Sequence, residues 1–166
     1  EITIRRLERK KNLRYKNPNE LTLDECKLIG FWIADGTVNN LSKGGKEYVL
    51  CQSKTYPNII DWIDTVLTNT NIDYIKRVRK KSKTANNDYY TWHIPRGTAG
   101  GSQERNGIYH LETYLNKNGS EFFWGLDEKQ FDALLEGICY GDGFHHQAAN
   151  GFPKSVRITN TNHNLI

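Results

Sequence analysis

Two aspartates in this 166-residue chain have the same local setting: each stands directly before a glycine and five positions after another glycine. The pairs are Gly30 with Asp35 and Gly137 with Asp142. One Asp-Gly step after an apolar run usually marks only a turn. A second copy with the same upstream glycine is harder to explain in that way, so the spacing favours a shared functional role for the two acids.

The glycines predict how these acids are held. Gly30 and Gly137 fall inside helical patterns, where a glycine costs roughly 1 kcal/mol relative to alanine. That cost is explained if two helices approach each other backbone to backbone, so we expect the two helices to pack through these positions. We also expect Gly36 and Gly143 to end the helices in the left-handed conformation.

This packing would place Asp35 and Asp142 side by side at the C-terminal ends of two helices. The helix dipole adds about half a negative charge at each end, and the acids also repel each other, so the arrangement needs a cation. Hard oxygen ligands favour Mg²⁺, with Mn²⁺ as a substitute, over zinc. Two carboxylates that share ions with phosphates suit two-metal hydrolysis of a phosphodiester bond.

The rest of the sequence predicts the elements that must position these acids. A helical pattern begins at Leu21, with Thr22 or Asp24 as its cap, and ends at Gly36. Pro57 opens another helix, with a pair of strands on each side of it along the chain. The order helix, two strands, helix, two strands, helix, and then the start of the same order, indicates an α+β fold. The remaining predicted elements are strands near 37–38 and at 48–52, 74–81 and 89–94, a short helical segment at 109–115 and a helix at 126–140.

An internal repeat supports this order. Sliding the sequence against itself until Asp35 meets Asp142 also aligns Leu28 with Leu135. A repeat of this kind indicates two copies of one supersecondary unit. The predicted organisation is a basic N-terminal arm or linker at 1–20, a first repeat at 21–125 and the start of a second repeat at 126–166.

The segments 28–36 (LIGFWIADG) and 135–143 (LEGICYGDG) resemble the two namesake motifs of the LAGLIDADG homing endonucleases, a family that includes the endonuclease domains inserted in inteins. The resemblance implies an αββαββα repeat whose antiparallel sheet binds DNA, with the second repeat incomplete in this chain. It also implies a metal-dependent enzyme that makes site-specific double-strand cuts in duplex DNA, with Mg²⁺ as cofactor and Mn²⁺ as a substitute.

The resemblance assigns roles to individual residues. The last Asp of each motif binds the catalytic metal in this family, which implies metal-binding and catalytic roles for Asp35 and Asp142. The carbonyl group before each Asp often contributes, which implies metal contacts for Ala34 and Gly141.

Three further residues are catalytic candidates. Lys117 resembles the basic block that precedes the second motif in intein endonucleases, although the Ile-Pro pair of that block is absent. In that role Lys117 would stabilise charge at the scissile phosphate or polarise the attacking water. Gln52 and Lys54, at the end of a predicted strand, are the other candidates for organising that water.

Basic residues also indicate an anionic partner. The formal net charge is +4, and Lys and Arg crowd residues 5–16 and 76–83. The resemblance implies that the sheet lies in the major groove, although strand neighbours point to opposite faces and cannot all reach it. The arm either follows flanking phosphates or is a linker. The expected DNA-binding residues are Lys46, Gln52, Lys54, Lys76, Arg77, Arg79, Lys81, Lys83, Tyr90 and Arg157.

The cysteines and the hydropathy exclude several other classes of protein. Cys26, Cys51 and Cys139 are odd in number and far apart, so a disulfide framework or a zinc knuckle is not expected. We therefore expect a reducing, intracellular compartment, wherever host DNA lies. No apolar run is long enough for a membrane helix, so no membrane partner is expected.

Two alternatives to an active nuclease stay open at this point. The chain could be a non-cleaving DNA-binding protein of the same fold, or an intein-borne remnant that is folded but inert. Because the second repeat is incomplete, a partner chain, a swapped dimer or further residues would have to complete it. The sequence does not decide between a free-standing protein and one inserted in an intein.

Overall fold

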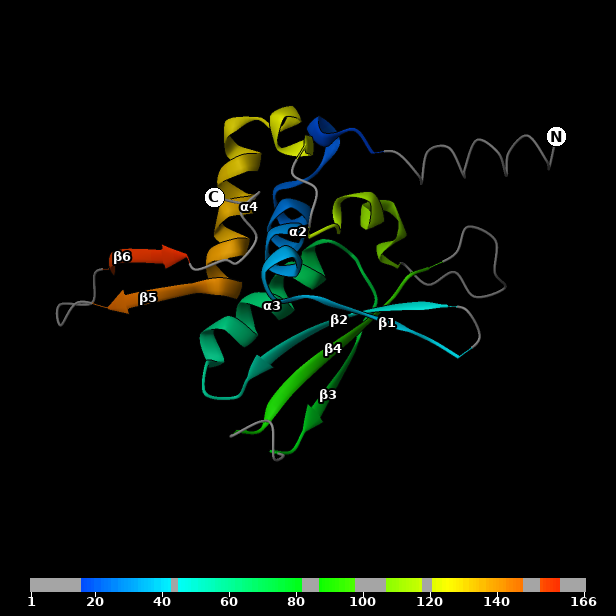
Figure 1. Cartoon of the computed structure of the whole chain (residues 1–166), viewed down its shortest axis with the longest axis vertical. Coiled ribbons are helices and arrows are strands. Elements are labelled where there is room, and N and C mark those ends of the chain that lie inside the picture. Colours follow the sequence, from blue (N-terminus) through cyan, green and yellow to red (C-terminus); the bar gives the residue numbers. More distant parts are fainter. Residues whose placement is uncertain are drawn as a thin grey trace.

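The computed structural model describes residues 16–42, 45–81, 87–97, 107–117, 121–147 and 153–158; for 121, 143–147 and 153–158 it describes the backbone alone. The elements follow the predicted order of helices and strands, and they combine helices with an antiparallel sheet as expected for an α+β fold (Figure 1). In chain order they are η1 (Pro18–Glu20), α2 (Leu23–Asp35), β1 (Thr37–Asn40), β2 (Lys46–Ser53), α3 (Pro57–Asn69), β3 (Ile75–Arg79), β4 (Tyr89–Pro95), η2 (Ile108–Tyr114), η3 (Glu121–Gly125), α4 (Glu128–Asp142), β5 (Gly143–Gln147) and β6 (Pro153–Ile158).

Local sequence explains where the first two long helices begin. Thr22 caps α2: its hydroxyl accepts a hydrogen bond from the Glu25 backbone N–H, and the Glu25 carboxylate accepts one from the Thr22 N–H. Pro57 occupies the first turn of α3, where its missing N–H has no cost. The predicted starts of both helices are confirmed.

The first four strands form one antiparallel sheet in the order β1-β2-β4-β3, and β5 pairs with β6 in a second, two-stranded sheet. The predicted pairing of 74–81 with 89–94 is confirmed, because β3 and β4 are antiparallel neighbours with Ile75 opposite His93 and Arg79 opposite Tyr89. The helix-strand-strand order of α2, β1 and β2 occurs again in α4, β5 and β6.

Helices cover one face of the four-stranded sheet (Figure 1). Tyr48 and Leu50 of β2 and Trp92 and Ile94 of β4 are buried in the same apolar core as the helices. These four residues are paired across the two strands, Tyr48 with Ile94 and Leu50 with Trp92, so they mark the covered face. The alternate residues of each strand therefore lie on the opposite, open face.

The predicted contact between the two motif helices is confirmed. A Cβ added at Gly30 would lie 2.1 Å from the Leu134 carbonyl oxygen of α4, and one added at Gly137 would lie 2.1 Å from the Lys27 carbonyl oxygen of α2. Because no side chain fits at either position, the two backbones lie against each other, as Figure 1 shows for α2 and α4.

The predicted left-handed conformation of Gly36 is wrong. Gly36 has a φ of −79° and extended backbone, which any residue can adopt. Glycine is required there for a different reason, since an added Cβ would lie 2.2 Å from Cδ1 of the Trp32 ring. A local contact with the ring of Trp32, four positions earlier in the chain, explains this glycine, rather than backbone conformation.

The glycine contact between α2 and α4 predicts the effect of one methyl group. Although alanine is the better helix former by about 1 kcal/mol, Gly137→Ala is expected to lower the free energy of unfolding by about 1 to 3 kcal/mol, because the helices must separate. Urea unfolding followed by circular dichroism measures the loss. Gly45→Ala is the control, since its methyl would lie 3.5 Å from the nearest atom, Cδ1 of Leu41. Equal stability of the two variants would contradict the contact.

Candidate active site at the ends of two packed helices

Asp35 is the last residue of α2, and Asp142 is the last residue of α4. The helices stay in contact up to these ends, because a Cβ added at Gly141 would lie 2.5 Å from the Cβ of Ala34 and 3.6 Å from the Cβ of Asp35. The packing therefore brings together the four residues expected around the metal, namely Ala34, Asp35, Gly141 and Asp142.

The two carboxyl groups influence each other. Burial and then the negative charge of Asp142 raise the pKa of Asp35 from its ordinary value of 3.8 to about 6. The Asp35 side chain is still accessible to solvent, so the burial reflects protein packed around one side of the carboxyl group. Burial also raises the pKa of Asp142. Both shifts mean that the protein around the two acids disfavours their ionised forms.

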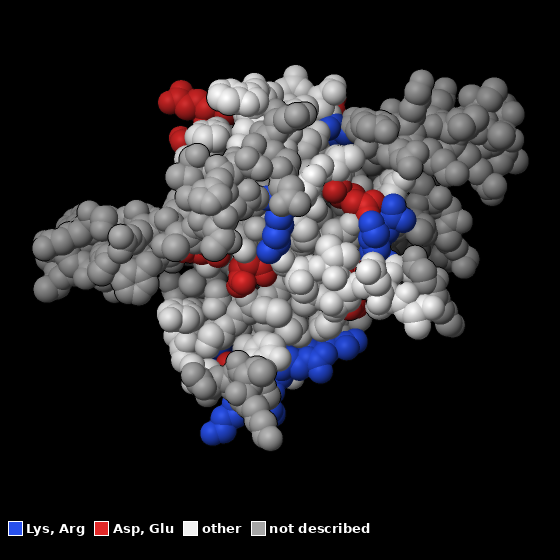
Figure 2. Space-filling model, in the orientation of Figure 1, with Lys and Arg blue, Asp and Glu red and all other residues white. Residues whose placement is uncertain are grey.

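Lys117 lies close to both acids, although it is far from each of them in sequence. Its positive charge opposes the rise in pKa at Asp35 and at Asp142. The Lys117 Nζ lies 5.8 Å from the centre of the Trp32 ring, one turn before Asp35 on α2. In Figure 2, acidic side chains gather near the lower ends of α2 and α4 with basic side chains beside them. The structure thus brings together three of the five predicted catalytic residues.

The segment η2 ends three residues before Lys117 and is itself firmly held. Ile108 and Leu111 are fully buried. The Glu112 carboxylate accepts hydrogen bonds from Arg96, with Nη2 at 2.8 Å, and from the Tyr48 hydroxyl at 2.6 Å. These contacts tie η2 to the sheet, so the backbone just before Lys117 has a fixed position relative to α2.

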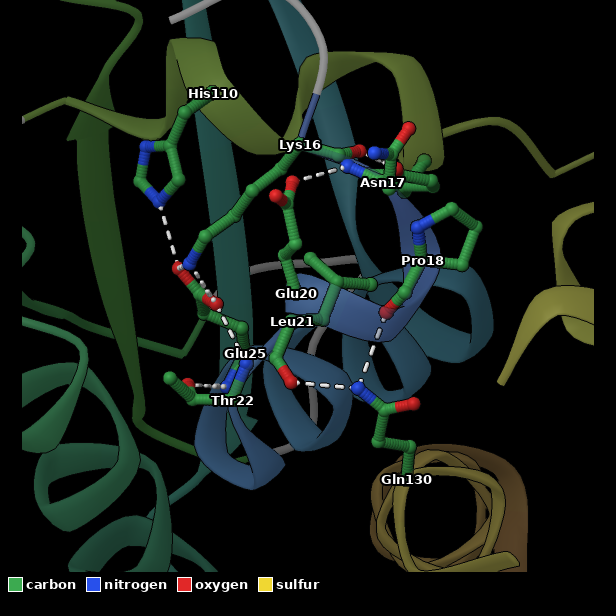
Figure 3. Close-up of polar contacts among 10 residues, drawn as sticks. Lys16, Asn17, Pro18, Glu20, Leu21, Thr22, Glu25, His110 and Gln130 are labelled. Atoms are coloured by element: carbon green, nitrogen blue, oxygen red, sulfur yellow. Dashed lines mark hydrogen bonds and ion pairs between the residues drawn. The ribbon is translucent and has the colours of Figure 1, made fainter. Parts of the chain in front are cut away.

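A second polar cluster fixes the opposite end of α2 (Figure 3). The buried Glu25 carboxylate accepts hydrogen bonds from Lys16 at 2.7 Å and binds His110 Nε2 at 3.0 Å. Burial would raise the pKa of Glu25, but the hydrogen bonds from His110, Lys16 and the Thr22 N–H outweigh it and lower the pKa to about 2. The Gln130 side chain of α4 donates to the Leu21 carbonyl at 2.7 Å. The starts of α2, α4 and η2 are therefore joined.

The strand register divides the predicted DNA-binding residues between two faces. Lys76 is opposite Trp92, and its Nζ binds Asp64 of α3 and lies 4.5 Å from the centre of the Tyr90 ring. Gln52 is opposite Tyr90. Lys76, Gln52 and Tyr90 therefore lie on the covered face, where Lys76 and Tyr90 have structural partners.

The open face carries the arginines. Arg77 and Arg79 of β3 are exposed and lie opposite Thr91 and Tyr89 of β4. Basic side chains gather at the lower end of the four-stranded sheet in Figure 2. Of the candidates on β3, these two arginines can meet a ligand that lies on the open face.

Cys51 links this open face to the acid pair. It is next to Gln52 on β2 but points to the opposite face, in register with Thr91. Burial raises the pKa of the Cys51 thiol, Asp35 raises it further, and Arg79 lowers it. The thiol therefore lies within electrostatic range of both Asp35 and Arg79.

A polar network on the open face was not predicted. Thr91 and His93 are buried there, with Thr91 Oγ1 3.1 Å from His93 Nε2, and His93 Nδ1 2.9 Å from Glu47 Oε2. Alternation along 89–94 puts Thr91 and His93 on one face, but only the strand register shows that Glu47 of β2 shares it.

The remaining candidates are placed as follows. Gln52 accepts a hydrogen bond from the Ser53 N–H at 2.8 Å, so its amide is engaged locally. Lys46 lies 3.7 Å from Glu112, and Lys54 lies 4.0 Å from Asp88. The contact with Asp88, just before β4, directs Lys54 toward the end of the sheet. Lys83 and residues 1–15 of the arm lie outside the described residues, and so does the side chain of Arg157.

The donor set at the helix ends fits a hard divalent cation. Among the described residues, no group of three or more His, Cys, Asp or Glu side chains is arranged to hold a metal. At the ends of α2 and α4 the oxygen donors are the carboxylates of Asp35 and Asp142 and the carbonyl groups of Ala34 and Gly141. Mg²⁺ commonly binds in this way, since it keeps several waters and uses one or two carboxylates together with phosphate oxygens. In the described part of the chain, no helix has the length and apolar character needed to cross a membrane.

The raised pKa of Asp35 predicts a pH dependence of stability. Because the folded pKa (about 6) exceeds the ordinary value of 3.8, metal-free protein should lose stability as pH rises from 3.8 through about 6. Asp35→Asn should flatten this profile. Thermal unfolding in EDTA from about pH 5 to about pH 7.5 measures the profile. In this range Glu25, whose pKa is lowered from 4.5 to about 2 on folding, is mostly ionised in both the folded and the unfolded protein. Parallel profiles for the two proteins would contradict the shift.

No protein-family model and no curated protein matches the chain. Among solved structures, the chain is similar to a variant of the LAGLIDADG homing endonuclease I-DmoI, in complex with its nicked target DNA in the presence of manganese. The TM-score is 0.45 and the sequence identity 12%, over 78% of this chain. The chain spans 64% of the length of that structure. At this level of similarity, function has to be inferred from the residues of the chain itself.

Proposed function

We propose that this chain is a LAGLIDADG-type homing endonuclease domain, a site-specific enzyme that hydrolyses phosphodiester bonds of duplex DNA with a divalent metal. One observation carries the proposal: Asp35 and Asp142 meet at the ends of two helices that touch through glycine, with Lys117 beside them. Asp35 acts electrostatically on Cys51, which lies on the sheet face that bears the exposed arginines.

In this proposal Asp35 and Asp142 hold Mg²⁺ or Mn²⁺, and the carbonyls of Ala34 and Gly141 are further oxygen ligands. When bound, such ions polarise phosphate oxygens and lower the pKa of a bound water. The raised pKa of Asp35 means that its proton must leave before it can act as a ligand, so metal binding should strengthen as pH rises through about 6. The cation also removes the repulsion between the acids, which supports its presence in the working enzyme.

Lys117 has a separate role. Its ammonium group lies beside the acids and would stabilise the negative charge that develops on the scissile phosphate, or orient the attacking water. Because η2 fixes the backbone that leads to Lys117, the Lys117 side chain starts from a defined position before DNA binds.

The open face of the four-stranded sheet would contact the major groove. Arg77 and Arg79 suit guanine edges or phosphates. In the proposed arrangement 21–125 is the first repeat, and α4, β5 and β6 begin the second repeat at 126–166. A partner chain, a swapped dimer or further residues of the same chain would supply the remaining strands of the second sheet.

Loss of one acid should abolish cutting and leave binding. A randomised duplex library incubated with the protein and Mg²⁺, followed by sequencing of the cut ends, would identify the target. On that target, Asp142→Asn should cut at least about 100-fold more slowly, while its affinity for the duplex in EDTA should stay within about 2-fold.

Asp132→Asn, an exposed position on the same helix, is the matched control and should cut like the wild-type protein. Equal cutting by the wild type and Asp142→Asn in Mg²⁺ would defeat the proposed mechanism. Salt-dependent binding without any metal-dependent cutting would instead indicate a non-cleaving DNA-binding protein.

Neighbouring residues on β3 test the DNA-binding face. Arg77→Ala should weaken the affinity for the selected duplex by roughly 5- to 100-fold, because the side chain lies on the open face. Lys76→Ala removes the same charge from the covered face and should change the affinity by less than about 2-fold. Fluorescence anisotropy over a range of KCl concentrations measures both. An equal loss of affinity in the two variants would show that the open face is not the binding surface.

A further inference from the structure

A buried tryptophan, Trp32, lies on the same helix as Asp35, and the Lys117 ammonium group lies over its ring. We propose that Trp32 is a positioning residue, whose indole ring holds the Lys117 ammonium group beside Asp35 and Asp142. The Lys117 Nζ is 5.8 Å from the ring centre, within the range in which a cation is attracted to an aromatic face. This inference rests on the proposed function, because it gives Trp32 its role through Lys117.

Two features of the structure are unfavourable or restrictive consequences of having the Trp32 ring at this position. The Trp32 side chain is buried, and its indole N–H has no hydrogen-bond partner among the described residues. An unpaired buried N–H lowers stability, and an aliphatic side chain or phenylalanine would avoid this cost. Residue 36 must also be glycine to leave room for the ring. Trp32 is part of the apolar core and packs on Tyr48, and in addition its ring lies beneath the Lys117 ammonium group.

Trp32 and Lys117 are also connected through the protein. The Trp32 ring packs against the Tyr48 ring, with 6.0 Å between their centres. The Tyr48 hydroxyl binds Glu112 of η2 at 2.6 Å, and the chain then continues from η2 to Lys117. The position of the ring and the position of the lysine backbone are therefore set by one connected group of contacts.

This connection explains why a flexible side chain can act as a fixed charge. A lysine side chain has many rotamers and loses conformational entropy when it is ordered, so a backbone anchor alone leaves the ammonium group mobile. The ring limits that mobility and keeps the charge near both acids, where it acts on their pKa values. Without the ring, the backbone of Lys117 should stay in place and the ammonium group should move.

The first test needs neither DNA nor metal. In protein labelled with ¹³C at the lysine ε-carbon, the Lys117 signal, assigned by its loss in Lys117→Met, should be displaced upfield by the indole ring current. Trp32→Leu should return it to the position of an ordinary lysine, and Trp32→Phe, which keeps an aromatic face, should leave part of the displacement. An ordinary Lys117 shift in the wild-type protein would overturn the proposal.

The second test is a double-mutant cycle on the rate of single-turnover cutting of the selected duplex. Trp32→Leu should slow cutting by about 10-fold when Lys117 is present and by less than about 2-fold in the Lys117→Met background. Trp32→Phe, the milder variant, should fall between wild type and Trp32→Leu. Trp62→Leu is the control for core packing, since Trp62 stacks on Tyr140 of α4, and its effect should be the same in both backgrounds.

The outcomes separate the two proposals. A slower rate in Trp32→Leu that is equal in both backgrounds would show that Trp32 only supports the fold, and would overturn its positioning role while the nuclease proposal stands. A displaced Lys117 signal in a protein that cuts no duplex would support the contact between ring and ammonium, and would remove the proposed function instead.

Discussion

The contact between α2 and α4 through Gly30 and Gly137 is the constraint on which the site depends. At each of these glycines an added Cβ would lie 2.1 Å from a carbonyl oxygen of the other helix, so the backbones touch. Two helices this close carry their last residues to the same place. The site is therefore a consequence of helix packing: the glycines make Asp35 and Asp142 neighbours, and neighbouring acids call for a cation.

The carboxylates at the two ends of α2, Glu25 and Asp35, have pKa values that are shifted in opposite directions. Glu25 and Asp35 are both affected by burial, which favours the neutral acid. At the N-terminal end, hydrogen bonds to Glu25 from His110, Lys16 and the backbone reverse this effect, and the helix dipole is favourable there. At the C-terminal end, Asp35 meets a second acid and the unfavourable end of the dipole. The negative charge of Glu25 is thus compensated by groups of the protein. The negative charge of Asp35 is only partly compensated, by Lys117.

Local features of the sequence predicted most of the elements, because caps, prolines and apolar periodicity act over a few residues. The helix contact was also predictable, since Gly30 and Gly137 are unfavourable in a helix unless a neighbour requires them. The face of each β3 side chain was not, because only pairing with β4 shows that Arg77 is on the open face and Lys76 is against Asp64. Gly36 was misjudged for a different reason: the sequence shows where the helix ends but not where the Trp32 ring lies, and that ring makes glycine necessary four positions later. The division into two repeats and the catalytic roles stay predictions.

The central claim is that the ends of α2 and α4 form one divalent-cation site. The most direct measurement is an anomalous difference map at the manganese absorption edge, from crystals grown with Mn²⁺. The account predicts a manganese peak in contact with carboxylate oxygens of both Asp35 and Asp142. A map without a peak there, or with the ion bound elsewhere and the two carboxylates apart, would contradict it.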